Sequence, residues 1–237
     1  EENPSIYDTI NTNVMGTSNI FEAARILGVE RVVNCSSAGV YDFTKERPTA
    51  PISPDWSISP KDNIPYFSSK IAVEAIARNY NHKYDTQIIT VRLGGNFGPS
   101  VRYNMGDKLW IYKLLRDAAI NGSINFDKVQ TRDLPWTYGK DTADCLVHIA
   151  YSTSEPKIPV YNCAYHSLNG LNEMLDVLNE LIPGLQVNIN KTEKIGWKFP
   201  YDVSQIQNDF GYQFSYGMKE AFADYIKWIR SNPQFNQ

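Results

Sequence analysis

Residues 31–41 read RVVNCSSAGVY, and this stretch decides the fold. Its β-branched start predicts a short buried strand, and the serines and glycine that follow predict the turn that ends the strand. Residues 87–93, QIITVRL, predict a second strand, which also ends at glycine. A helix is expected between the two, over residues 67–84, because apolar residues recur there at helical spacing. Strand, helix and strand in this order predict a largely parallel sheet covered by helices.

The alternation of helices and strands continues along the chain, so the expected fold class is α/β. Residues 42–65 contain five prolines and little periodicity, and we expect a long ordered loop or lid there. Further helices are expected over residues 12–28, 107–121, 141–151, 171–181 and 217–231, and further strands over residues 160–163 and 186–190.

The composition argues against several classes of function. The 237 residues include 23 basic and 26 acidic side chains, and a net charge of −3 does not suit a nucleic-acid surface, which needs clustered basic residues. No apolar run approaches the roughly 18 residues that a membrane-spanning helix needs. The three cysteines are far apart and form no C-x-x-C, which predicts reduced thiols and a cytoplasmic location. The three histidines are equally scattered, so no metal site is expected.

Tyr66 and Lys70 form the sharpest chemical signal. They lie four residues apart at the start of a predicted helix and therefore share one face of it. Taken alone, a Y-x-x-x-K pattern is more often an exposed tyrosine and a solvated lysine. Here a predicted strand ends at Ser36 and Ser37, a pair that also suits a plain strand-to-loop turn. Because the carboxyl ends of parallel strands form the ligand crevice of a sheet, we expect Ser37, Tyr66 and Lys70 to meet there.

This combination resembles the extended short-chain dehydrogenase/reductase family, in its branch of NAD-dependent sugar epimerases and dehydratases. The resemblance runs along nearly the whole chain. Besides the serine strand and the Tyr–Lys pair, the motifs that carry it are N-V-x-G-T from Asn13 to Thr17, RLGGNFGP over residues 92–99, D-x-A at Asp141 and Ala143, and Asp202, residues 210–212 and Trp228 near the C-terminus.

The resemblance implies a Rossmann-like, mostly parallel sheet with a smaller α/β cap that binds the substrate. The catalytic part would comprise residues 1–99 and 137–166, and the cap residues 100–136 and 167–237. The family opens with a glycine-rich phosphate loop, but the glycines of this chain form neither G-x-G-x-x-G nor G-x-x-G-x-x-G. We therefore expect the N-terminal half of the nucleotide-binding domain to be absent from this chain, and the chain alone to bind dinucleotide weakly.

The resemblance also implies a role for each residue of the motif. Tyr66, as phenolate, would exchange a proton with a substrate hydroxyl while the nicotinamide of NAD or NADP exchanges a hydride. Ser37 would hydrogen-bond the same oxygen, and Lys70 would hold the nicotinamide ribose and lower the pKa of Tyr66. Lowering that pKa from about 10 to about 7 takes roughly 4 kcal/mol, which an ammonium and an oxidised nicotinamide can supply in a dry site. The residues implied to bind the cofactor are Asn13, Asn34, Cys35, Ser36, Tyr66 and Lys70.

The implied substrate is a small molecule, and a nucleotide sugar is expected. Gly95 stands where the family's turn usually has asparagine, and Arg132 reads equally well as an ordinary surface arginine paired with a nearby aspartate. Ala38 and Gly39 supply no acid after the strand, which favours epimerase or dehydrogenase chemistry over elimination. The residues implied to bind the substrate are Ser37, Ala38, Gly95, Asn96 and Arg132.

Two other functions remain open. The chain could act as a dehydrogenase or reductase whose substrate carries a non-sugar hydroxyl, or it could be a truncated, non-catalytic interaction protein. The choice between NAD and NADP also stays open, because the residue that sets it belongs to the half expected to be missing. Helices over residues 12–28 and 67–84 carry apolar faces, and the resemblance implies a homodimer through them. Neither a nucleic acid nor a membrane is expected as a partner.

Overall fold

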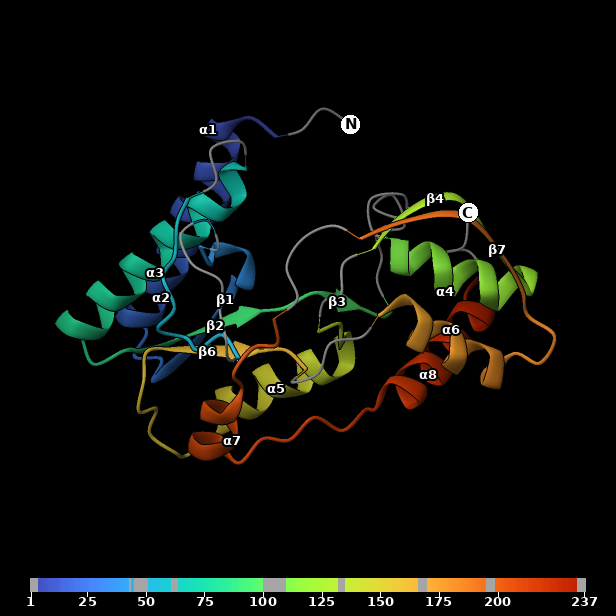
Figure 1. Cartoon of the computed structure of the whole chain (residues 1–237). Helices are drawn as coiled ribbons and strands as arrows, with labels where there is room; N and C mark the ends of the chain where they lie inside the picture. The colour runs from blue at the N-terminus through green and yellow to red at the C-terminus, as the bar shows by residue number, and fades with distance from the viewer. Residues whose placement is uncertain are drawn as a thin grey trace. The chain divides into compact units, whose positions relative to one another are not determined.

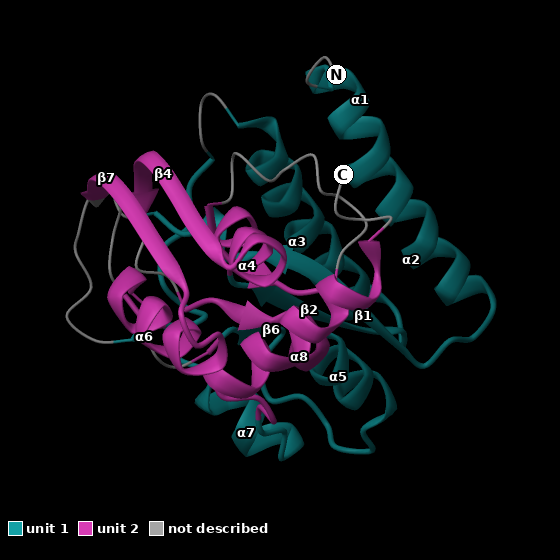
Figure 2. Cartoon of the chain, turned by 90° about the vertical axis from the view of Figure 1, so that its right-hand side faces the viewer, with its two compact units in different colours: residues 1–94, 143–164, 201–213 teal, residues 95–142, 165–200, 214–237 magenta. Residues whose placement is uncertain are grey.

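The computed structural model describes residues 4–42, 44, 51–60, 64–99, 110–131, 135–165, 170–194 and 199–233. Figure 1 traces the elements along the chain, and Figure 2 colours the two compact units that they form. Unit 1 comprises Glu1–Gly94, Ala143–Ala164 and Tyr201–Gln213, and unit 2 comprises Gly95–Thr142, Tyr165–Pro200 and Phe214–Gln237. The division expected from the sequence differs from these limits chiefly at residues 95–99, 137–142 and 201–213.

A three-stranded parallel sheet forms the centre of unit 1. Its strands are β1 (Arg31–Ser37), β2 (Gln87–Leu93) and β6 (Val160–Cys163), in the order β1-β2-β6. The β1–β2 register runs from Arg31 opposite Gln87 to Ser37 opposite Leu93. Leu93 in turn lies opposite Cys163 of β6. All three strands therefore end at the same edge of the sheet, and the predicted parallel α/β arrangement is confirmed.

Helices cover both faces of this sheet. α2 (Gly16–Ile26) and α3 (Pro65–Lys83) lie on one face, and α5 (Gly139–Tyr151) lies on the other (Figure 1). A small apolar cluster of Phe21, Val73, Ala77 and Ile88 joins the first two helices to β2. A short helix, α7 (Ser204–Phe210), was not expected from the sequence. Within the described ranges, no helix combines the length and the apolar character needed to cross a membrane.

The N-terminal helical segment begins earlier than the sequence predicted. The start expected at residue 12 is wrong, because Ser5 is the N-cap and its side chain accepts the Asp8 N–H. Helix α1 (Ile6–Thr9) then continues through a π-helical turn, η1 (Ile10–Met15), into α2. Polar residues that would suit a cap lie instead inside the wide turn.

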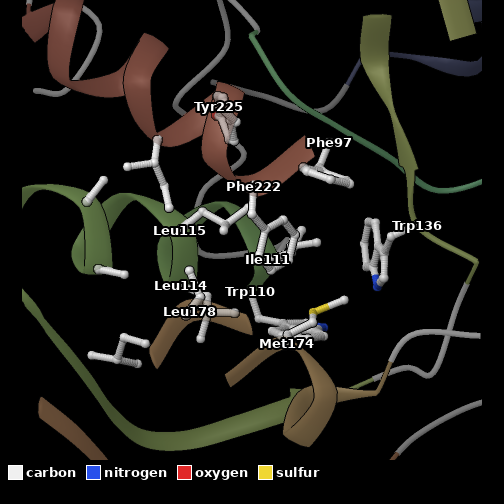
Figure 3. Packing of buried hydrophobic residues seen from close by; sticks show 14 of the residues in the cluster. Phe97, Trp110, Ile111, Leu114, Leu115, Trp136, Met174, Leu178, Phe222 and Tyr225 are labelled. Carbon is white, nitrogen blue, oxygen red and sulfur yellow. The ribbon is translucent and has the colours of Figure 1, made fainter. Parts of the chain in front are cut away.

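Unit 2 is built around a different core. Its helices are α4 (Trp110–Asn121), α6 (Leu171–Leu181) and α8 (Met218–Ser231). Figure 3 shows how side chains from these three helices meet in one apolar cluster. The fully buried members of the cluster include Ile111, Leu114 and Leu115 from α4, Met174 and Leu178 from α6, and Phe222 and Tyr225 from α8.

Two small parallel sheets complete unit 2. β4 (Ser123–Thr131) pairs with β7 (Gln186–Lys194), and β3 (Asn96–Phe97) pairs with β5 (Thr137–Tyr138). The sequence predicted only the first half of β7 and none of the other three strands. In β4 the alternation of buried and exposed residues breaks at Asp127 and Lys128, which are both exposed. Because of this break, the sequence lacks the regular alternation of apolar and polar residues that predicts a strand.

The proline-rich segment after β1 is an ordered loop over its described part, residues 51–60. Tyr41 pairs with Ile58 in an isolated antiparallel bridge, and Ile52 pairs with Tyr201 in a parallel one. The indole N–H of Trp56 donates to the backbone oxygen of Asp42 over 2.8 Å. These bonds bind the segment to the rest of unit 1.

Candidate active site

Ser37 is the last residue of β1 and begins the turn that leaves the sheet. Its side-chain oxygen accepts the N–H of Gly39 over 3.2 Å, which caps a single 3-10 turn over Ala38–Val40. The hydroxyl is therefore held at the carboxyl edge of the sheet, where the sequence predicted it.

Tyr66 lies in the first turn of α3, which begins at Pro65. A proline at this position is already set for helical geometry and has no N–H to leave unpaired. The Tyr66 side chain is 42 % exposed and shares a side-chain hydrogen bond with Ser37. The Lys70 ammonium lies 5.4 Å from the centroid of the Tyr66 ring. The structure thus brings together the three residues that the sequence singled out.

The pKa of Tyr66 lies above its ordinary value in this environment. Burial raises it most, the neighbouring Cys35 raises it further, and the hydrogen bond with Ser37 lowers it. Lys70 donates to the backbone oxygen of Cys35 over 2.8 Å, and burial lowers the pKa of its ammonium while Cys35 raises it. The chain's own residues therefore keep Tyr66 protonated at neutral pH, in the opposite direction to the shift that proton removal requires.

Asn13 supports the first turn of α3 from the π-helical turn. Its side-chain amide donates to the Ser69 hydroxyl over 3.0 Å, and that hydroxyl donates to the Tyr66 backbone oxygen over 2.7 Å. Ser69 is 3 % exposed, so this relay is shielded from water. A contact of Asn13 with a cofactor stays a prediction. In the structure, Asn13 helps to hold the backbone of Tyr66 in place through Ser69.

Asn34 and Ser36 point away from the Ser37–Tyr66 pair. Alternation along β1 puts both side chains on the face that α3 covers. The Asn34 amide donates to the Thr90 hydroxyl over 3.2 Å, and the Ser36 hydroxyl donates to the Glu74 carboxylate over 2.5 Å. Both residues are buried, and the cofactor contacts expected of them remain predictions.

A buried ion pair beneath the site escaped the sequence analysis. Glu74 of α3 receives Arg92 of β2 in a bidentate contact, with nitrogen–oxygen distances of 2.9 and 2.7 Å. Both side chains are 1 % exposed. Arg92 also donates to the Pro54 backbone oxygen over 2.8 Å, and its guanidinium lies 4.7 Å from the centroid of the Tyr41 ring. One available signal was that Glu74 follows Lys70 by one helical turn, among the apolar residues of the covered face.

The residues expected to bind substrate fall in different parts of the chain. Ala38 is buried in the turn after Ser37 in unit 1. Gly95 and Asn96 belong to unit 2, where the Gly95 oxygen accepts the Thr137 N–H and the Asn96 side-chain oxygen accepts the Thr142 hydroxyl. Arg132 lies outside the described residues. Substrate contacts by these residues therefore stay predictions.

Asp141 lies in the first turn of α5 and not at its N-cap, because the helix begins at Gly139, two residues before the expected start at residue 141. Its fully buried carboxylate instead accepts the Tyr165 hydroxyl over 2.7 Å and the N–H groups of Ser215 and Tyr216 over 2.8 and 3.2 Å. The D-x-A motif thus joins three distant segments of unit 2.

Comparison with known proteins identifies a family whose model matches most of the chain. The model of the NAD dependent epimerase/dehydratase family matches residues 2–164. A UDP-glucuronate 4-epimerase of Thermodesulfobacterium geofontis is 24 % identical over 244 residues, which cover 98 % of this chain and 68 % of that protein. A UDP-glucose 4-epimerase of Mycolicibacterium smegmatis is 30 % identical over 138 residues, which cover 57 % of this chain and only 42 % of that protein.

Solved structures show the same fold. The UDP-glucuronic acid 4-epimerase from Bacillus cereus, in complex with UDP-glucuronic acid and NAD, has a TM-score of 0.75 and 17 % identity, and the match covers 97 % of this chain and 71 % of that one. RMD from Pseudomonas aeruginosa, complexed with NADPH, has a TM-score of 0.79 and 16 % identity, with 96 % and 76 % covered. At these identities the likeness is one of fold.

Proposed function

Because the chain belongs to the NAD dependent epimerase/dehydratase family, we propose that it acts as a nicotinamide-dependent epimerase whose substrate is a nucleotide sugar. The observation that carries the proposal is the meeting of Ser37, Tyr66 and Lys70 at the carboxyl end of β1. An interaction protein without catalysis would have no need to keep a half-buried lysine beside a half-buried tyrosine and a serine.

The residues present fit the nicotinamide end of a dinucleotide. Lys70 spends one of its three N–H donors on the Cys35 oxygen, which leaves donors for the two hydroxyls of a ribose. The sequence offers no glycine-rich loop for the pyrophosphate. When bound, the nicotinamide supplies the hydride acceptor, and its positive charge favours a phenolate nearby.

Tyr66 is the proposed base in this mechanism. As phenolate it removes the proton of a substrate hydroxyl, and Ser37 donates a hydrogen bond to the same oxygen. Each unit by which the pKa of Tyr66 must fall takes about 1.4 kcal/mol. Among the chain's own residues, the hydrogen bond with Ser37 supplies part of this, and in the reverse step Tyr66 returns the proton to the substrate oxygen.

The same three residues would also serve a dehydrogenase or reductase of a non-sugar hydroxyl. Ala38 and Gly39 provide no acid next to Ser37, which favours a reaction that retains the substituents of the substrate over an elimination. The names of the relatives, UDP-glucuronate 4-epimerase among them, favour the nucleotide sugar.

The test is turnover of a panel of nucleotide sugars by the full-length protein with NAD. An epimerised product without net formation of reduced nicotinamide supports the proposal. Tyr66→Phe is the matched control, because it removes one hydroxyl and should cost about 10²–10⁴-fold in rate. Accumulation of reduced nicotinamide would favour a dehydrogenase, and a Tyr66→Phe variant that keeps more than about a tenth of the rate would exclude Tyr66 as the base.

A further inference from the structure

Gly39 lies in direct contact with the ring of Phe67. A Cβ built on Gly39 would come within 2.0 Å of Cε1, 2.4 Å of Cζ and 2.8 Å of Cδ1 of that ring. Gly39 is not among the glycines with positive φ, so its backbone conformation suits other residues. What the position requires is the absence of a side chain, because the ring fills the space that one would occupy.

This contact joins the two segments that carry the proposed catalytic groups. On one side, the Gly39 N–H donates to the Ser37 side-chain oxygen. On the other side, Phe67 follows Tyr66 directly, and the two rings meet edge to face with centroids 5.4 Å apart. A displaced Phe67 ring presses on Tyr66 or turns away from the sheet, and in either case the ring contact between the turn after β1 and the first turn of α3 is lost.

We propose that Gly39 is a positioning residue that acts through Phe67: by admitting the ring, it seats the first turn of α3 so that the Tyr66 hydroxyl reaches Ser37. The inference rests on the proposed function only for its kinetic readout. Gly39 touches no reacting atom, and its effect passes entirely through the aromatic pair.

A double-mutant cycle tests this inference. Gly39→Ala in the full-length protein should lower kcat by about 10- to 100-fold, since a misplacement of the order of 1 Å in a catalytic group has effects of this size. The substrate KM should change little. In a Phe67→Ala background the same Gly39→Ala change should have almost no effect, because the ring that it displaces is gone.

Gly217→Ala is the matched control. The Cβ that it adds also meets an atom at short distance, but that atom is the carboxylate oxygen of Glu220, 2.5 Å away at the end of a flexible side chain in unit 2. This variant should keep the kinetic constants of the parent protein. A loss in Gly39→Ala that Gly217→Ala shares would contradict a role specific to the Phe67 contact.

Titration of Tyr66 gives a readout that needs no turnover. The protein is labelled with ¹³C at the tyrosine ring carbon that bears the oxygen. The signal that disappears in the Tyr66→Phe variant is that of Tyr66. Gly39→Ala should move that titration to higher pH, because the hydrogen bond with Ser37, which lowers the pKa of Tyr66, is weakened. A role in stability alone would leave the titration in place.

The outcomes separate the two claims. If the parent protein turns over no nucleotide sugar but Gly39→Ala shifts the Tyr66 titration, the proposed function fails and the positioning role stands. If Gly39→Ala costs as much in the Phe67→Ala background as in the parent protein, or leaves the titration unchanged, the positioning role is wrong. Where Gly39→Ala alone does not fold, the double variant must fold as well as Phe67→Ala does, and its failure to do so also overturns the inference.

Discussion

Tyr66 shows how a residue can be well placed for a reaction before its acidity suits that reaction. Burial raises the pKa of its phenol above the ordinary value of about 10, so the fraction present as phenolate at neutral pH is small and grows about tenfold with each pH unit. With Tyr66 as the proposed base, the rate of substrate oxidation should therefore rise with pH across the neutral and mildly alkaline range.

Ser37→Ala should shift this pH profile in a known direction. The hydrogen bond from Ser37 lowers the pKa of Tyr66, so its loss raises that pKa and moves the rising limb of kcat/KM to higher pH. Ser59→Ala is a suitable control, because its hydroxyl contacts only the neighbouring Pro60 oxygen at 3.3 Å among the described residues. A flat profile from about pH 7 to about 9, or a limb that Ser37→Ala moves to lower pH, would show that Tyr66 is not the titrating base.

Residue-level chemistry was partly readable from the sequence. Ser37, Tyr66 and Lys70 belong to short motifs whose spacing survives folding, so the sequence predicted that they meet. The Glu74–Arg92 pair and the Gly39–Phe67 contact join segments 18 and 28 positions apart in the numbering, and nothing in local spacing marks such partners. The side of the sheet on which each serine side chain lies was also not predicted. Ser36 and Ser37 look alike in the sequence, but strand alternation turns Ser36 toward Glu74 and Ser37 toward Tyr66.

At the scale of the element, α3 is held at two levels. Asn13 and Ser69 fix its first turn, and the Glu74–Arg92 pair fixes the middle of the helix against β2. Removing one partner of a buried ion pair leaves the other charge without compensation, which commonly costs about 3–5 kcal/mol.

Glu74→Gln should therefore lower the free energy of unfolding by about 3–5 kcal/mol, measured by urea denaturation with an unchanged m-value. Glu180→Gln is the matched control, since it removes the same group from the exposed Glu180–Lys219 pair and should leave the denaturation midpoint nearly in place. Equal midpoints for the two variants would mean that Glu74 contributes no more than a surface carboxylate.

Elements were predictable where one periodicity persisted. β1, β2, β6 and α6 follow the limits expected from the sequence closely, because each keeps a single pattern from end to end. The N-terminal segment mixes α-helical and π-helical turns, and β4 changes its alternation midway. In those two elements the structure depends on contacts with residues distant in the sequence, such as Ser69 and the residues of β7, which the local pattern does not reveal.

At the scale of the whole molecule, the 237-residue chain should bind NAD weakly. Pyrophosphate affinity in Rossmann folds comes largely from glycine-loop amides at a helix N-terminus, and this sequence has no such loop. Isothermal calorimetry on the chain should show no saturable binding at micromolar NAD. Tight binding by this chain alone would mean that other residues supply the phosphate contacts.

The chain is also expected to form a homodimer. Large apolar side chains on the N-terminal helices are widely exposed in the single chain, including Ile6 at 64 %, Ile20 at 61 % and Leu27 at 78 %, and exposed apolar surface of this kind marks an interaction site. Light scattering at micromolar concentration should report twice the mass of the chain, and Ile20→Lys should reduce it. A species of single-chain mass only would contradict the dimer.

The way in which the two units share the chain has a consequence for biosynthesis. Each unit is assembled from three separate segments, and unit 1 takes its last one from Tyr201–Gln213. From the end of β2 at Leu93, a ribosome that adds about 5–20 residues per second needs about 5–20 seconds to reach that segment. During this time the β-branched strands β1 and β2 wait for β6 and α7, with their backbone edges open to other nascent chains. Slower initiation, lower temperature or added chaperones should therefore raise the soluble yield of this protein more than that of one whose domains are contiguous in sequence.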